Sequence, residues 1–137
     1  MKSNRSMPAS TIIPVLPYAN VGEAVQWLCA AFGFTVRLRI GDHRAQLNAE
    51  DGAIVVTKRQ SGDDVVHPAW VMMRVSDVDA HYAHARAHGA AVSQPPADHH
   101  YGERQYVAED IGGHQWTFTQ SIADVAPEEW GGVSGEL

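Results

Sequence analysis

The sequence predicts an α+β fold made of two βαβββ modules. The first reason is a repeated order of elements: a strand, a helix and three short strands occur in residues 11–60 and again in residues 69–120. The second reason is that the two predicted helix caps, Asn20 and Asp77, lie 57 residues apart (20 to 77). Because about 50 residues bury too little surface to fold alone, we expect both modules to form one domain.

The domain is expected to have short irregular ends. Residues 1–10 predict a flexible N-terminal arm, because they contain Ser and Pro but no apolar run. Residues 11–130 form the predicted domain, with a polar linker over 61–68 between the modules. Residues 131–137 are expected to be a tail.

The composition is ordinary for a soluble globular protein, with 137 residues of which 45% are apolar and 19% charged. A net charge of −6 and a pI near 5.7 argue against nucleic acid as a partner. No stretch approaches the ~18 apolar residues of a membrane span, and the start has no secretory pattern. The single cysteine, Cys29, allows no internal disulfide, so we expect a reducing, cytoplasmic location.

The first module begins with a predicted strand over 11–18, whose two prolines favour a sheet edge. Asn20 caps a helix with Glu23 three residues later, a variant of the capping box, and Gly33 ends that helix. The residues expected to be buried at helical spacing are Val21, Ala24, Val25, Leu28 and Phe32. The strands that follow are predicted at 34–40, 44–49 and 53–58, with turns at Gly41-Asp42 and Asp51-Gly52.

The second module repeats this plan with a strand over 69–75 and a helix from Asp77 to Gly89. That helix is expected to bury Val78, Tyr82 and Ala85. The next strand starts at 91–93, and its prolines predict an interrupting loop over 94–98.

A hairpin of strands 103–109 and 114–120 completes the second module. A four-residue turn over 110–113 would pair Glu109 with His114. The same register would pair Tyr106 with Thr117 and Arg104 with Thr119.

The most specific part of the sequence surrounds this hairpin. Tyr101-Gly102-Glu103-Arg104 and then Asp110-Ile111-Gly112-Gly113-His114-Gln115-Trp116 resemble the Tyr-Gly-x-Arg and Asp-Pro-x-Gly-His-x-Trp motifs of one family. That family is the glyoxalase/bleomycin-resistance/dioxygenase superfamily, also called vicinal oxygen chelate proteins. Ile111 stands where the family commonly has Pro. The resemblance covers residues 11 to about 130 and implies a curved mixed sheet around a cleft, commonly in a homodimer.

Metal-dependent members of this family hold a divalent ion with one side chain from each of four strands. The resemblance places these four positions at Ile13, Val55, Trp70 and Thr117. None of them is a suitable ligand, because a divalent ion needs a His nitrogen or a carboxylate oxygen. We therefore expect no metal and no cofactor, which disfavours glyoxalase I and extradiol dioxygenase activity.

Eight histidines could still suggest a metal site. His81, His84 and His88 form a stripe along one helix, which we interpret as a solvated flank, with adventitious Ni or Zn capture as the alternative. His99 and His100 lie in a predicted loop and could reach the mouth of the cleft, so a functional role for them stays open.

Alternation of side chains along the strands extends the four family positions to a cleft lining. Trp70 could stack a planar ligand or fill a vestigial metal site. Arg104 could pair with a ligand carboxylate or phosphate, or form an ion pair near the turn. The candidate ligand-binding residues are Trp70, Met72, Arg104, Tyr106, Thr117, Gln115, Val55 and Thr57.

This lining favours a metal-free small-molecule-binding protein that sequesters a drug or a metabolite. No catalytic residue can be assigned, since the sequence has no nucleophile elbow and no phosphate-binding loop. One alternative is an enzyme, either a metal-dependent lyase or dioxygenase with other ligands or a metal-free isomerase using residues 99–101. A second alternative is a dimerising interaction module with a filled cleft, which direct packing of Trp70, Met72 and Tyr106 would indicate.

Overall fold

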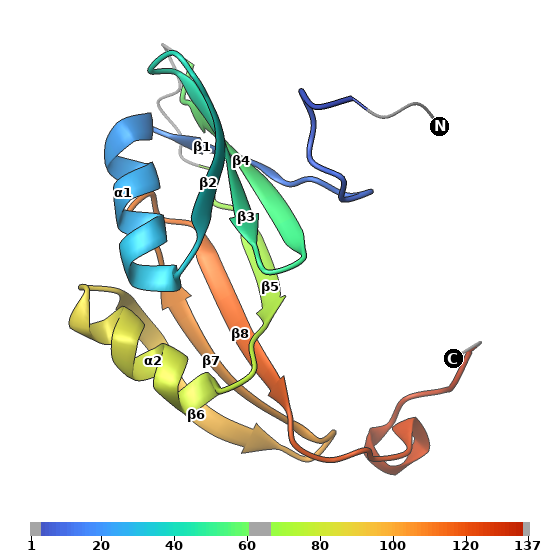
Figure 1. Cartoon of the computed structure of the whole chain (residues 1–137). Coiled ribbons are helices and arrows are strands. Elements are labelled where there is room, and N and C mark those ends of the chain that lie inside the picture. The colour runs from blue at the N-terminus through green and yellow to red at the C-terminus, as the bar shows by residue number, and fades with distance from the viewer. Residues whose placement is uncertain (1–3, 61–66, 136–137) are drawn as a thin grey trace. The chain divides into compact units, whose positions relative to one another are not determined.

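The computed structural model describes residues 4–60 and 67–135, so most of the predicted linker lies outside the described residues. The chain divides into two compact units, Met1–Ala69 and Trp70–Leu137. Each unit contains a four-stranded mixed sheet and one α-helix, which confirms the α+β fold of two βαβββ modules (Figure 1). Within the described ranges, no helix has the length and apolar character needed to cross a membrane.

The first unit has the strand order β1-β4-β3-β2, in which β1 is parallel to β4 and the other pairs are antiparallel. As its prolines predicted, β1 lies at a sheet edge. It begins later than expected, at Val15, although the carbonyl of Pro14 still accepts a hydrogen bond from the Val55 amide at 2.8 Å. The elements are β1 (Val15–Tyr18), α1 (Val21–Phe32), β2 (Thr35–Ile40), β3 (Arg44–Ala49) and β4 (Gly52–Lys58).

Helix α1 begins and ends where the sequence predicted. The Asn20 side chain accepts a hydrogen bond from the Glu23 amide at 2.9 Å, and Gly33 takes the left-handed conformation with a φ of 79°. The helix packs on β2, β3 and β4. The residues that it buries are the predicted Val21, Ala24, Val25, Leu28 and Phe32, together with Ala31.

The second unit has the order β5-β8-β7-β6, with β5 parallel to β8, and so repeats the topology of the first. The internal duplication inferred from the sequence is therefore present in the fold. Helix α2 is capped by Asp77 and buries Val78 and Ala85, while Tyr82 is half-buried. The elements are β5 (Trp70–Arg74), α2 (Val78–Ala87), β6 (Ala91–His99), β7 (Glu103–Glu109), β8 (Gln115–Ser121) and the 3₁₀ helix η1 (Pro127–Trp130).

Strand β6 runs through its prolines, so the expected loop over 94–98 is wrong. The strand tolerates them because it lies at the edge of the sheet, where a missing N–H costs no ladder bond. Its pairing with β7 shifts between Val92 and Gln94 and again between Gln94 and Ala97. The shifts are β-bulges, which accommodate the irregular backbone around the prolines within the strand.

The register predicted for the β7–β8 hairpin is also wrong, by one residue. Glu109 pairs with Gln115, and Tyr106 pairs with Phe118 instead of Thr117. A one-residue shift moves side chains to the opposite face of a sheet. The predicted orientation of β7 relative to β8 is therefore reversed.

The physical reason is the turn itself, in which the Asp110 amide donates a hydrogen bond to the His114 carbonyl at 2.9 Å, so that Asp110, and not Glu109, lies opposite His114. The Asp110 carboxylate accepts hydrogen bonds from the amides of Gly112 and His114 at 2.9 and 3.0 Å. Its second oxygen accepts the indole N–H of Trp116 at 2.9 Å. These three bonds hold the turn with His114 opposite Asp110, and the strands beyond it continue in this register.

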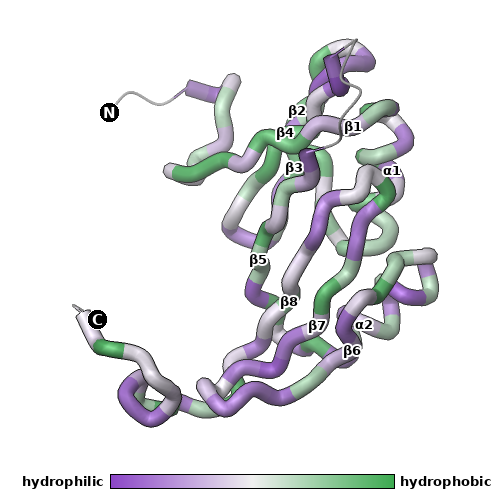
Figure 2. Tube along the Cα trace, turned by 180° about the vertical axis from the view of Figure 1, so that it is seen from behind, coloured by the Kyte–Doolittle hydropathy of each residue, from purple (hydrophilic) through white to green (hydrophobic). Residues whose placement is uncertain are grey.

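Each sheet has one face packed on its helix and an opposite face, which we call the open face of that sheet. Hydrophilic and hydrophobic residues follow one another along the strands in the hydropathy trace (Figure 2). The helix-facing core of the first unit includes Leu16, Leu47 and Val56, and that of the second includes Tyr106, Trp116 and Phe118. The candidate functional residues must be judged by the face on which they lie.

Candidate functional site on the open face of the second sheet

The open face of the second sheet follows from the pairing of β8 with its neighbours. Thr117 lies between Met72 on β5 and Val107 on β7, and Thr119 lies between Arg74 and Gln105. The neighbours Tyr106 and Phe118 point the other way, since their rings contact Tyr82 and His81 of α2. The residues of β5, β7 and β8 on the open face are Trp70, Met72, Arg74, Glu103, Gln105, Val107, Glu109, Gln115, Thr117, Thr119 and Ser121.

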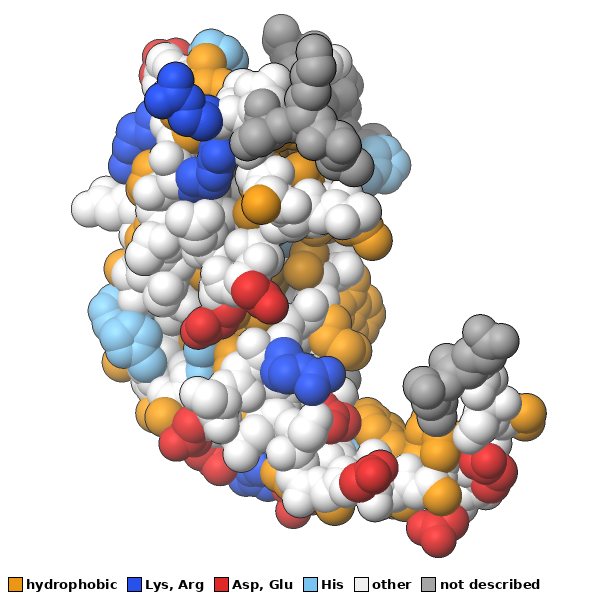
Figure 3. Space-filling model, turned by 45° about the vertical axis from the view of Figure 1, so that its right-hand side comes forward, with side chains coloured by type: hydrophobic (Ala, Val, Ile, Leu, Met, Phe, Trp, Pro, Cys, Tyr) orange, Lys and Arg blue, Asp and Glu red, His pale blue; other side chains and the backbone are white. Residues whose placement is uncertain are grey.

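Trp70 and Met72 form an exposed apolar surface at one end of this face. Their exposed fractions are 66% and 64%, and exposed hydrophobic side chains are visible in the space-filling view (Figure 3). The indole N–H of Trp70 donates to the Thr117 hydroxyl at 2.7 Å. The polar atom of the ring is thus satisfied by the sheet, while its aromatic surface remains accessible. Trp70 is not a core filler, which was the alternative considered from the sequence.

Beyond this surface, a chain of polar side chains extends along the same face. Tyr101 donates its hydroxyl to Gln105 at 3.0 Å, and the Gln105 amide donates to the Thr119 hydroxyl at 3.0 Å. Thr119 in turn donates to the Glu103 carboxylate at 2.6 Å. The face therefore changes from apolar to hydrogen-bonding along β8.

Glu103 ends this polar chain as an ionised group. Burial by itself would raise the pKa of its carboxyl. Hydrogen bonds from Ser121 and Thr119, with the positive charge of Arg74, outweigh burial and lower the pKa below the ordinary 4.5. The sequence did not identify Glu103 as a site residue, because the assumed register turned it towards the helix.

Tyr106 and Arg104, both predicted to line the cleft, lie on the helix side of the sheet. Tyr106 is fully buried and its hydroxyl hydrogen-bonds to His81 Nδ1 at 2.5 Å; burial raises the pKa of the phenol. Arg104 makes hydrogen-bonded ion pairs with Asp79 and Asp98, at 3.0 and 2.9 Å, which raise the pKa of its guanidinium. The expectation that both face the same side as Thr117 is wrong because of the hairpin register.

The remaining candidates divide between the two units. Gln115 is half-buried beside Trp70 on the open face of the second sheet. Val55 and Thr57 belong to the first unit, where they lie on the open face with their neighbours Gln46 and Arg44. Trp70 and Met72 do not pack against Tyr106, so the feature expected of a filled interaction module is not found in the second unit.

The histidine stripe of α2 is only partly a solvated flank. His81 packs its ring on Phe118, with centroids 4.1 Å apart, which contradicts the prediction for this residue. His84 and His88 are exposed and their rings lie 4.4 Å from each other. His99 ends β6 and stacks on Tyr101 at 5.1 Å; a functional role for it stays a prediction.

The four family metal positions do not offer a divalent ion its usual ligands. Val55 and Ile13 are hydrocarbon side chains, Trp70 presents an N–H donor, and the Thr117 hydroxyl already accepts that donor. Across residues 4–60 and 67–135, no three His, Cys, Asp or Glu side chains are grouped so that they could hold a metal. The residues at these positions therefore do not fit the family's metal ion.

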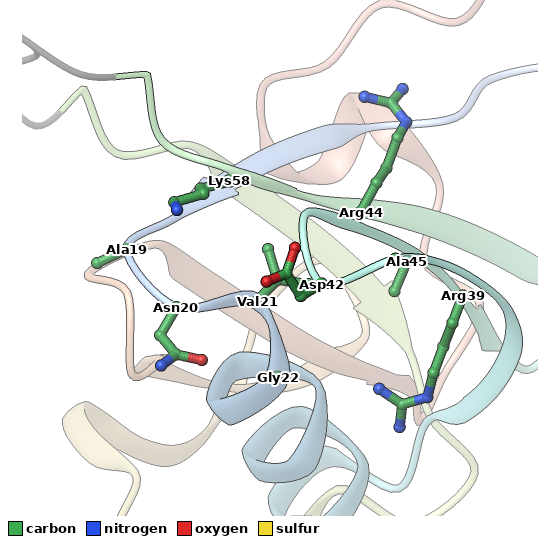
Figure 4. Close-up of a pocket in the computed structure, with 10 residues that line it drawn as sticks. Ala19, Asn20, Val21, Gly22, Arg39, Asp42, Arg44, Ala45 and Lys58 are labelled. Atoms are coloured by element: carbon green, nitrogen blue, oxygen red, sulfur yellow. The ribbon is translucent and has the colours of Figure 1, made fainter.

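A pocket of about 380 Å³ in the first unit was not foreseen from the sequence. It lies where α1 begins, beside the turn between β2 and β3 (Figure 4). The side chains of Arg39 and Arg44 point away from each other in this view. The lining residues are Ala19, Asn20, Val21, Gly22, Arg39, Gly41, Asp42, Arg44, Ala45 and Lys58.

Comparison with known families identifies the chain. Residues 12–118 match the family described as the Glyoxalase/Bleomycin resistance protein/Dioxygenase superfamily. The protein therefore belongs to this superfamily, as its hairpin motifs predicted. A comparison with curated proteins gives no match.

Solved structures agree with this assignment. The chain is 33% identical to TioX from Micromonospora sp. ML1, with a TM-score of 0.71 over 85% of this chain and 100% of that one. A glyoxalase/bleomycin resistance protein/dioxygenase from Nocardioides is 18% identical, with a TM-score of 0.65 over 93% and 89% of the two chains. A family enzyme from Burkholderia phytofirmans PsJN is 14% identical, with a TM-score of 0.69 over 80% and 97%. The last two similarities concern the fold alone.

Proposed function

We propose that this protein is a metal-free small-molecule-binding protein that sequesters a planar drug or metabolite on the Trp70 surface. The observation that supports it most is the 66% exposure of an indole whose N–H is already bonded to Thr117. An aromatic ring held in this way offers its face to a ligand without losing a hydrogen bond. Met72 enlarges the surface with a polarisable side chain that adapts to ligands of different shape.

The chemistry of the open face favours binding over catalysis. The polar groups at its centre bind one another, since the Gln105 amide donates to the Thr119 hydroxyl and that hydroxyl donates to the Glu103 carboxylate. A cysteine nucleophile is also disfavoured, because burial raises the pKa of the Cys29 thiol and keeps it protonated. We further propose that the protein works as a homodimer in the cytoplasm, as its family resemblance and its single cysteine suggest.

The first test is ligand affinity in Trp70 variants. A thermal-shift screen of planar aromatic compounds would supply a ligand, and calorimetric titration would then give its Kd. We expect Trp70→Ala to weaken binding at least tenfold, or about 1.4 kcal/mol, and Trp70→Phe to weaken it less. The matched control is Trp130→Ala, which removes a partly exposed tryptophan from η1 and should leave Kd unchanged.

The second test asks whether the ligand is transformed. The compound would be incubated with an equimolar amount of protein, extracted and examined by mass spectrometry. Recovery of unchanged ligand, together with the Trp70 result, supports sequestration. Unchanged affinity in Trp70→Ala would reject the surface as the site, and a chemically altered ligand would favour the enzyme alternative.

A further inference from the structure

We propose that Arg37 and Gln46, on the open face of the first sheet, form a binding site for successive amide carbonyls. In this structure residues 4–10 occupy the site, and a peptide-like ligand would compete with them for it. This surface lies in the first unit and is separate from the residues that carry the proposed function. The ligand class that it fits is an extended chain with consecutive carbonyl groups.

The geometry of the arm supplies the observation. Gln46 donates its amide N–H to the carbonyl of Ser6 at 2.8 Å. The Arg37 guanidinium donates to the carbonyls of Arg5 and Met7 at 3.0 and 2.9 Å. Three consecutive backbone carbonyls are therefore bound by two side chains. Such contacts recognise the peptide backbone and do not depend on the side chains that it carries.

A hydrogen bond between Arg37 and Gln46 orients both side chains towards the arm. Arg37 also donates to the Gln46 side-chain oxygen at 2.5 Å, which turns the Gln46 amide nitrogen towards Ser6. With the arm in place Gln46 is only 2% exposed, so its bond to the Ser6 carbonyl is shielded from water. A shielded bond of this kind favours a chain of carbonyls on this surface, whether it comes from the arm or from a ligand.

The arm itself is held weakly, which is why it can exchange. Among residues 4–10 only Pro8 is buried, whereas Asn4, Arg5, Ser6 and Met7 are exposed. Apolar burial consequently adds little, while fixing the backbone of seven residues is opposed by conformational entropy. The balance rests on the hydrogen bonds to Arg37 and Gln46, so the arm should open readily and a competing chain of carbonyls should displace it.

Tryptic cleavage of the full-length protein after Arg5 tests this inference, because Arg37 holds the carbonyl of the bond to be cut. We expect Arg37→Met to accelerate cleavage about tenfold and Gln46→Met to accelerate it several-fold. Addition of the blocked heptapeptide Asn-Ala-Ser-Met-Pro-Ala-Ser at millimolar concentration should also accelerate cleavage of the wild type. This peptide has the sequence of residues 4–10 with the R5A change, so trypsin does not cut it.

The matched control is Arg39→Met, which removes the same charge from the same strand. Arg39 pairs with Ala45, and its charge acts on Cys29 of α1, so it lies on the helix side. Cleavage should stay at the wild-type rate in this variant. Equal rates in wild type and Arg37→Met, or no effect of the peptide on wild type, would overturn the inference. Arg37→Met should still bind the ligand found for the Trp70 surface with the wild-type Kd. Measuring that Kd separates a failure of this inference from a failure of the proposed function.

Discussion

At the scale of single residues, Trp70 combines an exposed ring with a satisfied polar group. An indole whose N–H is bonded only to water can change its side-chain rotamer. The hydrogen bond to Thr117 restricts the orientation of the Trp70 ring. A restricted ring loses less conformational entropy when a ligand stacks on it. The exposed aromatic surface is therefore preorganised, and this is the physical reason for choosing it as the binding surface.

Asp110 is expected to contribute strongly to stability. The Asp110 carboxylate accepts three hydrogen bonds, and the residue is only 6% exposed. Asp110→Ala removes all three bonds, including the one from the buried Trp116 indole N–H. We expect the free energy of unfolding to fall by about 3–5 kcal/mol, measured by urea denaturation. The control Glu109→Ala changes the neighbouring exposed residue and should cost under about 0.5 kcal/mol. A similar loss in both variants would contradict this role for the carboxylate.

The lowered pKa of Glu103 predicts that the protein loses stability as the pH falls. The folded-state pKa of Glu103 lies below the ordinary 4.5, so the unfolded chain takes up the proton first as the pH falls. The stabilisation by the carboxylate is complete above pH 4.5 and is lost as the pH falls through the folded-state pKa. In Glu103→Gln, the difference in unfolding free energy from wild type should shrink between pH 6 and pH 3. A difference that stays constant over this range would contradict the prediction.

At the scale of elements, Gly102 joins β6 to β7 in a conformation that only glycine accepts easily. Its φ is 90°, and a Cβ built there would lie 2.1 Å from the carbonyl oxygen of Ala123. Gly102→Ala should therefore destabilise the protein by about 2–4 kcal/mol in urea denaturation. The same change at Gly22 inside α1, where the nearest atom is 3.7 Å away, should stabilise it by up to about 1 kcal/mol. Equal effects at the two glycines would refute the steric explanation.

The elements also explain what could be predicted from the sequence and what could not. Helix α1 was predicted in full because its cap, apolar spacing and final glycine are local signals. The hairpin register was not, since it depends on how Asp110 binds His114 across the turn. This one-residue error placed Tyr106 and Arg104 on the wrong face and hid Glu103. The edge position that lets β6 contain two prolines is likewise a property of the sheet and not of the local sequence.

At the scale of the whole molecule, the proposed absence of a metal can be measured directly. Tag-free protein would be dialysed against a mild chelator, exposed again to Ni, Zn, Mn and Fe, and subjected to elemental analysis. We expect no retained ion and an unchanged Tm, because the four family positions provide no suitable ligands. Retention of about one ion per subunit that survives substitution of His81 and His84 would contradict this expectation and indicate a metalloenzyme.

The two units share a topology but differ in what covers their open faces. In the first unit, residues 4–10 bind to Arg37 and Gln46, and the edge strand β1 exposes Val15. In the second, the equivalent edge strand β5 exposes the larger side chains of Trp70 and Met72. After the duplication, the halves have therefore kept their framework and diverged at the surface where ligands are proposed to bind.

The turn that begins at Asp110 sets the sign of the charge on the open face. Arg104 and Glu103 are adjacent in the sequence, carry opposite charges and face opposite sides of β7. A turn in which Glu109 pairs with His114 would shift β7 by one residue against β8 and would exchange an acidic group for a basic one on the open face. The same shift would drive Tyr106 out of the core. Substitutions in this turn can therefore reverse the charge that the open face offers a ligand, but only with loss of core packing.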